Sequence, residues 1–140
     1  MSLINTARGE DGQIMRCLMM IMAVTLSLTD AGWSDTPTPE QRAFQQCQGC
    51  HQIGPNAKNG MGPVLTGIIG RESASISDYT YSPAMKQSRL VWTEDNIRAF
   101  LHKPRKFVPF TKMTFSGLDD DEVISLILGY LKQFPASNPR

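Results

Sequence analysis

The most informative stretch of the sequence is Cys47-Gln48-Gly49-Cys50-His51. Two thiols separated by two residues on one helical turn lie on the same side, so each can form a thioether with a vinyl group of one haem. His51 directly follows Cys50 and is held beside the iron on that face. This five-residue pattern is typical of c-type haem attachment. It predicts one covalently bound haem c, with Cys47 and Cys50 as attachment points.

Two other chemistries use paired cysteines and stay open at this point. A zinc site needs about four ligands, and beyond the pair and His51 the chain after residue 34 offers only His102 and carboxylates. A thioredoxin-like redox pair belongs in a βαβ setting, which a glycine-rich helical chain lacks. Both are less favoured than haem.

Length and composition indicate one ordinary globular domain. The chain has 140 residues, of which 41% are hydrophobic and 19% charged, and single domains cluster near roughly 100–150 residues. The formal net charge is +1, so a protein that coats nucleic acid is not expected.

The N-terminal region has the pattern of a secretory signal peptide. The uncharged run Cys17–Leu28 follows Arg16 and precedes small residues. Its twelve residues fall short of the ~20 that a membrane-spanning helix needs. We therefore expect a periplasmic protein, with tethering by an uncleaved leader as the less favoured alternative.

The boundaries of this leader follow from the same pattern. Cleavage after Ala31 or Ser34 satisfies the small-residue requirement, so residues 1–34 form the predicted leader and 35–140 the predicted haem domain. Because Glu10 and Asp11 are unusual in such a leader, we hypothesise that translation begins at Met15. N-terminal sequencing of the precursor that showed Met1 would refute this.

The rest of the chain reads as helical. Cap residues followed by Pro or by acidic residues predict helices over 39–48, 83–88, 94–102 and 119–134, whereas 49–70 holds too many Gly and Pro residues for a regular element. No stretch alternates with period two, so the fold class is predicted to be all-α. Gly129 within the last helix costs about 1 kcal/mol in propensity, which predicts a close backbone approach, with the helix around Ala43 as neighbour.

A haem held by one histidine still needs a sixth ligand, and a methionine sulfur opposite histidine is the pair that favours electron transfer. Three methionines follow the leader: Met61, Met85 and Met113. Met61 lies close in sequence to His51, and Met85 fits a core position. Met113 lies between two predicted helices and is a mild favourite on these grounds.

The whole chain after the leader resembles the class I c-type cytochromes, the family of mitochondrial cytochrome c and its periplasmic bacterial relatives. The blocks that carry the resemblance occur in order: Cys47-Gln-Gly-Cys-His51, Gly62-Pro63-Val-Leu-Thr-Gly67, Gly70-Arg71, Tyr79-Thr-Tyr81-Ser, Trp92, Pro109-Phe-Thr-Lys-Met113-Thr-Phe-Ser-Gly117, and Tyr130-Leu131 in the closing helix.

The resemblance implies a compact cytochrome c-like helical fold around one buried haem. It implies that His51 is the proximal ligand and Met113 the distal one, and that the Pro63 carbonyl accepts a hydrogen bond from the other ring nitrogen of His51. It further implies that Arg71, Tyr81 and Trp92 surround the haem propionates. Tyr81 and Trp92 as plain core aromatics, and Arg71 as a solvated charge, are the structural alternatives.

Together these features predict a soluble, monomeric electron carrier rather than an enzyme, cycling between Fe(II) and Fe(III). The family's partners include cytochrome bc complexes, terminal oxidases and reaction centres, and a dehydrogenase is also compatible. A haem enzyme or gas sensor with an open sixth position, and a haem subunit of a larger complex, are the rival functions.

The charges predict how a partner is approached. Residues 98–112 contain five Lys or Arg and no acid, whereas 119–122 are all acidic. A basic frame around Met113 would steer an acidic partner. The acidic run departs from the strongly basic mitochondrial pattern, which leaves the identity of the partner open.

Overall fold

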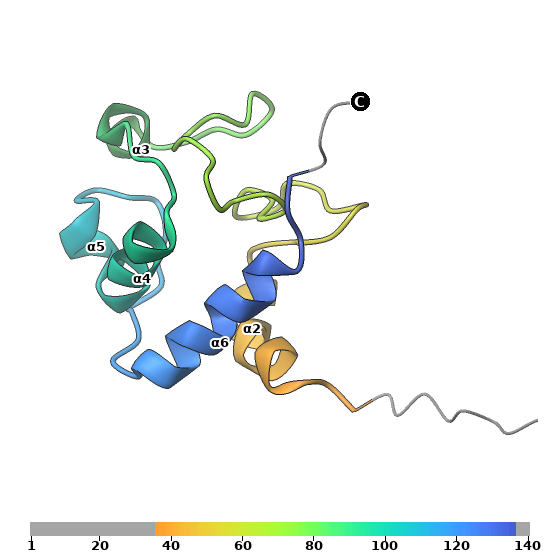
Figure 1. Cartoon of the computed structure of the whole chain (residues 1–140). Coiled ribbons are helices and arrows are strands. Elements are labelled where there is room, and N and C mark those ends of the chain that lie inside the picture. Colours follow the sequence, from red (N-terminus) through yellow and green to blue (C-terminus); the bar gives the residue numbers. More distant parts are fainter. Residues whose placement is uncertain (1–35, 137–140) are drawn as a thin grey trace, which may run out of the picture. The chain divides into compact units, whose positions relative to one another are not determined.

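The structure is a computed structural model that describes residues 36–136. Five helices lie in this part of the chain (Figure 1): α2 (Pro39–Gln48), α3 (Pro83–Ser88), α4 (Glu94–His102), α5 (Pro104–Phe107) and α6 (Asp121–Lys132). Within it, the only β pairing is an isolated bridge between Glu72 and Val91. The predicted all-α class is therefore confirmed. The predicted leader and its cleavage positions lie outside the described residues.

None of the helices in the range 36–136 has the length and apolar character required to cross a membrane.

Local capping explains where the first three of these helices begin. Thr38 and Gln41 form a reciprocal capping box at the start of α2, with the Thr38 backbone N–H donating to Gln41 Oε1 at 2.8 Å. The side chains of Ser82 and Thr93 cap α3 and α4 by accepting the backbone N–H groups of Met85 and Asn96, each three residues further along the chain. The predicted starts of these three helices are confirmed because short-range hydrogen bonds fix them.

One short helix was not predicted, and the last helix, predicted over 119–134, spans Asp121–Lys132 in the structure. Residues 104–107 form the short helix α5, which the sequence did not predict. Pro104 ends α4, as expected, yet it also suits the first turn of a new helix, where its missing N–H costs nothing. The last helix begins at Asp121 rather than at 119, because the carboxylate of Asp120 accepts the N–H groups of Glu122 and Val123 at 2.9 and 3.2 Å.

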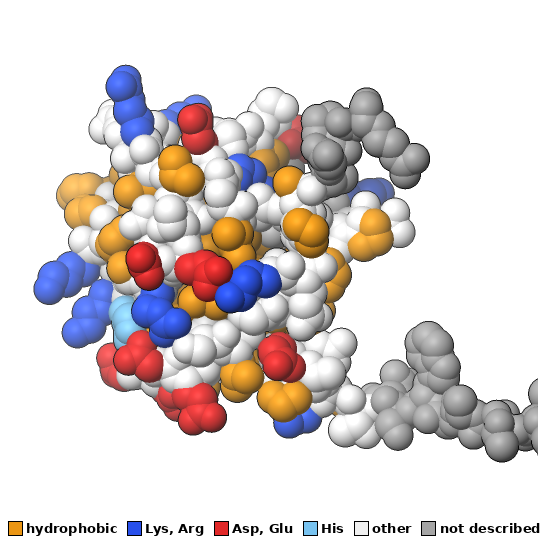
Figure 2. Space-filling model, in the orientation of Figure 1, with side chains coloured by type: hydrophobic (Ala, Val, Ile, Leu, Met, Phe, Trp, Pro, Cys, Tyr) orange, Lys and Arg blue, Asp and Glu red, His pale blue; other side chains and the backbone are white. Residues whose placement is uncertain are grey.

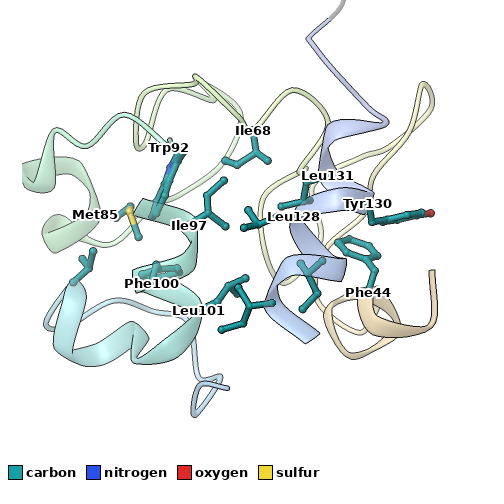
Figure 3. Close-up of a cluster of buried hydrophobic side chains, with 13 residues drawn as sticks. Phe44, Ile68, Met85, Trp92, Ile97, Phe100, Leu101, Leu128, Tyr130 and Leu131 are labelled. Carbon is teal, nitrogen blue, oxygen red and sulfur yellow. The ribbon is translucent and has the colours of Figure 1, made fainter. Parts of the chain in front are cut away.

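The core lies where α2 and α4 meet α6. Helix α6 packs against both, and α4 also packs against α5. The rings of Phe44 from α2 and Tyr130 from α6 are 4.8 Å apart, at the point where the two helices touch. Figure 3 shows the α4 side chains Ile97 and Leu101 directed toward α6, whereas Phe100 lies near Trp92 and Met85. This arrangement fixes α2, and with it the cysteine pair at its C-terminal end, against the rest of the domain.

The close backbone approach predicted at Gly129 is wrong. Helix α2 is the expected neighbour, yet a Cβ at Gly129 would meet only Cγ of Glu40, at 3.5 Å, which is ordinary van der Waals contact. An alanine would fit there without displacing backbone. The two helices are kept together by side chains such as Phe44 and Tyr130 and not by a glycine contact.

Candidate functional site

A cavity of about 340 Å³ with mainly apolar walls lies within the described domain. This volume is in the range of roughly 300–1,000 Å³ in which proteins hold cofactors and other small molecules. All the site residues predicted from the sequence line it, namely Cys47, Cys50, His51, Pro63, Arg71, Tyr81, Trp92 and Met113. Segments from both halves of the domain thus contribute to a single site.

The end of α2 positions the two cysteines. Cys47 lies in the last turn of α2, and its carbonyl accepts the N–H groups of Cys50 and His51 at 3.1 and 2.9 Å. Both thiols are free. Burial, with a smaller contribution from Cys50, raises the pKa of the Cys47 thiol to about 11. Before haem is attached, Cys47 is therefore a protonated thiol at neutral pH. It lies at the cavity wall, and Cys50 is exposed at the rim of the cavity.

The ring of His51 is held by Pro63. Its Nδ1 lies 2.7 Å from the Pro63 carbonyl oxygen, and since a carbonyl can only accept, Nδ1 carries the proton in this contact. Burial lowers the pKa of His51, and the hydrogen bond to Pro63 opposes this shift. The result is a neutral imidazole whose Nε2 lone pair is available to a metal.

Gly62 is a site residue that the sequence reasoning missed. A Cβ at this position would lie 2.3 Å from Cε1 of His51 and 2.7 Å from its Nε2. The backbone at Gly62 therefore lies too close to the His51 ring for any side chain, and only glycine permits this. Nothing in the local spacing marks Gly62 as different from the other glycines of its loop, because the steric requirement comes from a residue eleven positions earlier.

Arg71 places a cation at the cavity wall. Its guanidinium donates to the carbonyl oxygens of Thr66 and Val64 at 2.9 and 2.8 Å. Burial lowers the pKa of Arg71, with the nearby Tyr81 opposing the shift. Within residues 36–136 no carboxylate forms an ion pair with Arg71. A half-buried cation without a carboxylate partner in a mostly apolar cavity is suited to an acidic group on a ligand.

Trp92 joins the wall next to Arg71. Backbone hydrogen bonds link Trp92 N to Arg71 O and Gly70 N to Trp92 O, both at 2.9 Å. The indole is buried and its ring centroid lies 5.1 Å from that of Phe100. Trp92 is thus both a core aromatic and part of the cavity wall. Its two predicted roles, core packing and a place near the haem propionates, are therefore compatible.

The three candidate methionines all line the cavity, in different surroundings. Met85 is packed in the core, with its sulfur 3.9 Å from the Ser88 hydroxyl. Met61 is 78% exposed. Met113 is half-buried in the segment between α5 and α6, whose end is fixed by a 2.9 Å hydrogen bond from Leu118 N to Leu101 O. Met113 alone is neither part of the packed core nor largely exposed.

These groups fit a covalently attached haem. Two thiols at one end of an apolar cavity, a neutral imidazole, a thioether and an unpaired cation correspond to its vinyl groups, iron and carboxylates. In the described part of the chain no cluster of three or more His, Cys, Asp or Glu side chains could hold a metal ion. The zinc alternative therefore has no donor set among those residues.

Comparison with known proteins agrees with the haem site inferred from the cavity residues. The chain is 40% identical over 120 residues to cytochrome c2 of Blastochloris viridis, covering 86% of this chain and 94% of the relative. It is 42% identical over 92 residues to cytochrome c-550 of Nitrobacter winogradskyi, covering 66% and 84% of the two chains. No family model matches the chain.

The fold agrees with a solved structure as well. Cytochrome cH from Methylobacterium extorquens superposes with a TM-score of 0.64 at 36% identity, covering 69% of this chain and 97% of that one. The cysteine pair, the histidine and the cavity that they line are thus embedded in a sequence and a fold shared with cytochromes c. The chain belongs to the class I c-type cytochromes, electron-transfer proteins that carry covalently bound haem c.

Proposed function

We propose that this protein is a periplasmic electron carrier, not an enzyme, in which Cys47 and Cys50 attach the haem and His51 and Met113 are the axial ligands. The observation that carries the proposal is the convergence of these four side chains on one cavity, although Met113 is separated from His51 by 62 positions. With His51 and Met113 both bound to it, the iron would have no position left for a substrate.

Each part of the cavity has a distinct task in this proposal. Bound haem supplies an iron that changes between Fe(II) and Fe(III). The Pro63 carbonyl orients the imidazole of His51, and the neutral sulfur of Met113 would, as a ligand of the iron, favour its reduced state. The apolar walls exclude water, and the Arg71 guanidinium would balance the charge of a propionate, with Tyr81 and Trp92 as further wall residues.

The Met113 assignment predicts a specific spectroscopic change. The purified holoprotein should be low-spin, show the weak sulfur-to-iron absorption band and leave added carbon monoxide unbound. Met113→Ala should lose the band and bind carbon monoxide readily, because alanine supplies no donor atom. Visible absorption spectra of the ferric, reduced and carbon monoxide-treated protein measure both effects.

The other two cavity methionines provide matched controls. Met61→Leu and Met85→Leu remove a sulfur at similar volume, so Met85→Leu should cost less than about 1.5 kcal/mol in stability, and neither variant should alter the band. If the band survived in Met113→Ala and vanished in either control, the ligand assignment would be wrong. A wild-type protein that bound carbon monoxide would instead favour the rival function, an enzyme or sensor with an open sixth position.

For partners, we propose a membrane-bound or periplasmic redox protein such as a cytochrome bc complex, a terminal oxidase, a reaction centre or a dehydrogenase. Exposed basic side chains of α5 and of the segment after it support an acidic partner surface. Figure 2 shows Lys and Arg side chains on the side where α5 lies and acidic ones toward the start of α6. Gel filtration of native extracts would separate a free monomer from a haem subunit of a larger complex.

We propose that residues 1–34 direct export and are then removed, so that haem attachment takes place outside the cytoplasm. The pattern from Arg16 to Ser34 supports this. N-terminal sequencing of the mature protein should give a chain that starts at Gly32 or Asp35. A mature chain that retained the apolar run would support a membrane tether instead.

A further inference from the structure

Phe110 combines two features that are each unfavourable in an isolated protein. Its side chain is 91% exposed, the largest exposure among the large hydrophobic residues of the described domain. Its backbone has φ +64°, in the left-handed region that disfavours residues with a Cβ. Neither feature stabilises the isolated protein, because a positive φ strains the backbone and an exposed ring buries no apolar surface.

The position of Phe110 in a turn explains the backbone. Thr111 N donates to Val108 O at 3.1 Å, which closes a four-residue turn with Pro109 and Phe110 at its centre. Proline at the second position and a positive φ at the third follow the pattern of a type II turn, in which the third residue is normally glycine. Glycine would relieve the strain here, yet the chain carries a large aromatic side chain at this position.

The turn also connects Phe110 to the cavity. The next three residues, Thr111, Lys112 and Met113, all line it, and Lys112 Nζ donates to Thr80 O at 3.1 Å on the opposite loop. The ring of Phe110 is therefore presented to solvent beside the rim of the site. A protein bound over Phe110 would lie near the redox centre, where a short distance favours electron transfer.

The charges near Phe110 indicate the kind of protein that would bind. Lys103, Arg105, Lys106 and Lys112 are exposed, and residues 98–112 contain no acid. Aromatic side chains at the centre of an interface supply much of its affinity, whereas the surrounding charges contribute mainly to the association rate. An exposed aromatic ring with basic neighbours fits this arrangement.

We propose that Phe110 is an apolar anchor for the redox partner, inserted into an apolar pocket that acidic side chains surround. The proposal rests on the electron-carrier function and adds to it one residue that determines partner affinity. The strained backbone is tolerated because it directs the ring outward, away from the core and toward the partner.

Three substitutions at this position separate anchoring from a structural role. Phe110→Gly should raise the midpoint of thermal unfolding of the holoprotein, because glycine accepts φ +64° without strain, and should weaken partner binding about tenfold. Phe110→Leu keeps an apolar side chain and should retain most of the binding. Phe110→Ala should bind as weakly as the glycine variant without its gain in stability. The rank order of these variants in thermal stability therefore differs from their rank order in partner binding.

The measurement is the second-order rate of reduction by a cytochrome bc complex, and of oxidation by a terminal oxidase, purified from the organism that makes this chain. Rates are taken at low and high salt, with ferricyanide as a small oxidant that has no apolar pocket. The loss in Phe110→Gly should persist at high salt and be absent with ferricyanide. Ala74→Gly is the matched control, since Ala74 has φ +57° and lies outside the cavity lining, so it should leave all rates unchanged.

The outcomes distinguish the two proposals. A wild-type protein that reacted with ferricyanide but with neither complex would overturn the anchor proposed for these partners, whereas one that did not react with ferricyanide either would refute the electron-carrier assignment. A wild-type protein that reacted normally, with a glycine variant that reacted equally well, would overturn the anchor alone. Loss of self-association in Phe110→Gly at unchanged electron-transfer rates would also overturn it, because the ring would then contact a second copy of this chain.

Discussion

Replacing Gly62 with alanine should disrupt the histidine side of the site. The new Cβ would lie 2.3 Å from Cε1 and 2.6 Å from Nδ1 of His51. The ring cannot move away without loss of its 2.7 Å hydrogen bond to Pro63 O. Overpacking together with a lost buried hydrogen bond should cost about 3 kcal/mol in unfolding free energy. The visible spectrum should also change, because the imidazole is displaced from the iron.

Gly49→Ala is the matched control for this variant. Gly49 lies between the two cysteines, has φ −62°, and has nothing within 4 Å of the position that a Cβ would take. Gly49→Ala should therefore have a visible spectrum and an unfolding free energy close to those of the wild type. Denaturant unfolding of both holoproteins, followed at the haem absorption, measures the difference. Equal stability and spectra for the two variants would contradict the close packing of Gly62 against His51.

Replacing Gly117 with alanine should have the largest effect on the fold. Gly117 has φ +111°, and a Cβ there would lie 2.1 Å from the carbonyl oxygen of His102, at the end of α4. That oxygen belongs to the backbone, so it cannot rotate away. We expect the stability to fall by more than about 3 kcal/mol. Because Met113 precedes Gly117 in the same segment, the sulfur-to-iron band should weaken as well.

Gly70 is a control that separates the cost of a positive φ from the cost of the steric contact between Gly117 and His102. Gly70 also has a positive φ, +81°, but nothing lies within 4 Å of its Cβ position. Gly70→Ala should therefore show only the conformational cost of about 1–2 kcal/mol. The difference between the two variants in unfolding free energy measures the clash at His102. If both substitutions cost the same, the backbone contact at Gly117 would not exist in solution.

Features that depend on short-range hydrogen bonds could be predicted from the sequence. The starts of α2, α3 and α4 follow from Thr38, Ser82 and Thr93, whose side chains accept N–H groups within their own first turn. The prediction of helix boundaries failed where the local sequence allowed two different boundaries. Both Asp119 and Asp120 could cap α6, and Pro104 could end one helix or begin another.

In the candidate site, too, the features set by adjacent residues could be predicted, and those set by distant segments could not. The cysteine pair and His51 form one local pattern, so the haem attachment could be predicted from five adjacent residues. The spacing of residues alone left Met61, Met85 and Met113 open, and only the resemblance to a family selected Met113. The role of Gly62, the carbonyl contacts of Arg71 and the outward position of Phe110 were not predicted at all.

The sequence by itself thus determined the chemistry of attachment, the helical class and most helix starts, since each depends on residues a few positions apart. Only the tertiary structure decided which glycines are indispensable, since the space for a Cβ at Gly62 or Gly117 is set by backbone or a ring from another segment. It likewise decided that Arg71 lacks a carboxylate partner in the described domain and that Phe110 is exposed. Exposure and steric contact are properties of the folded chain, because they depend on what other parts of the chain fill the surrounding space.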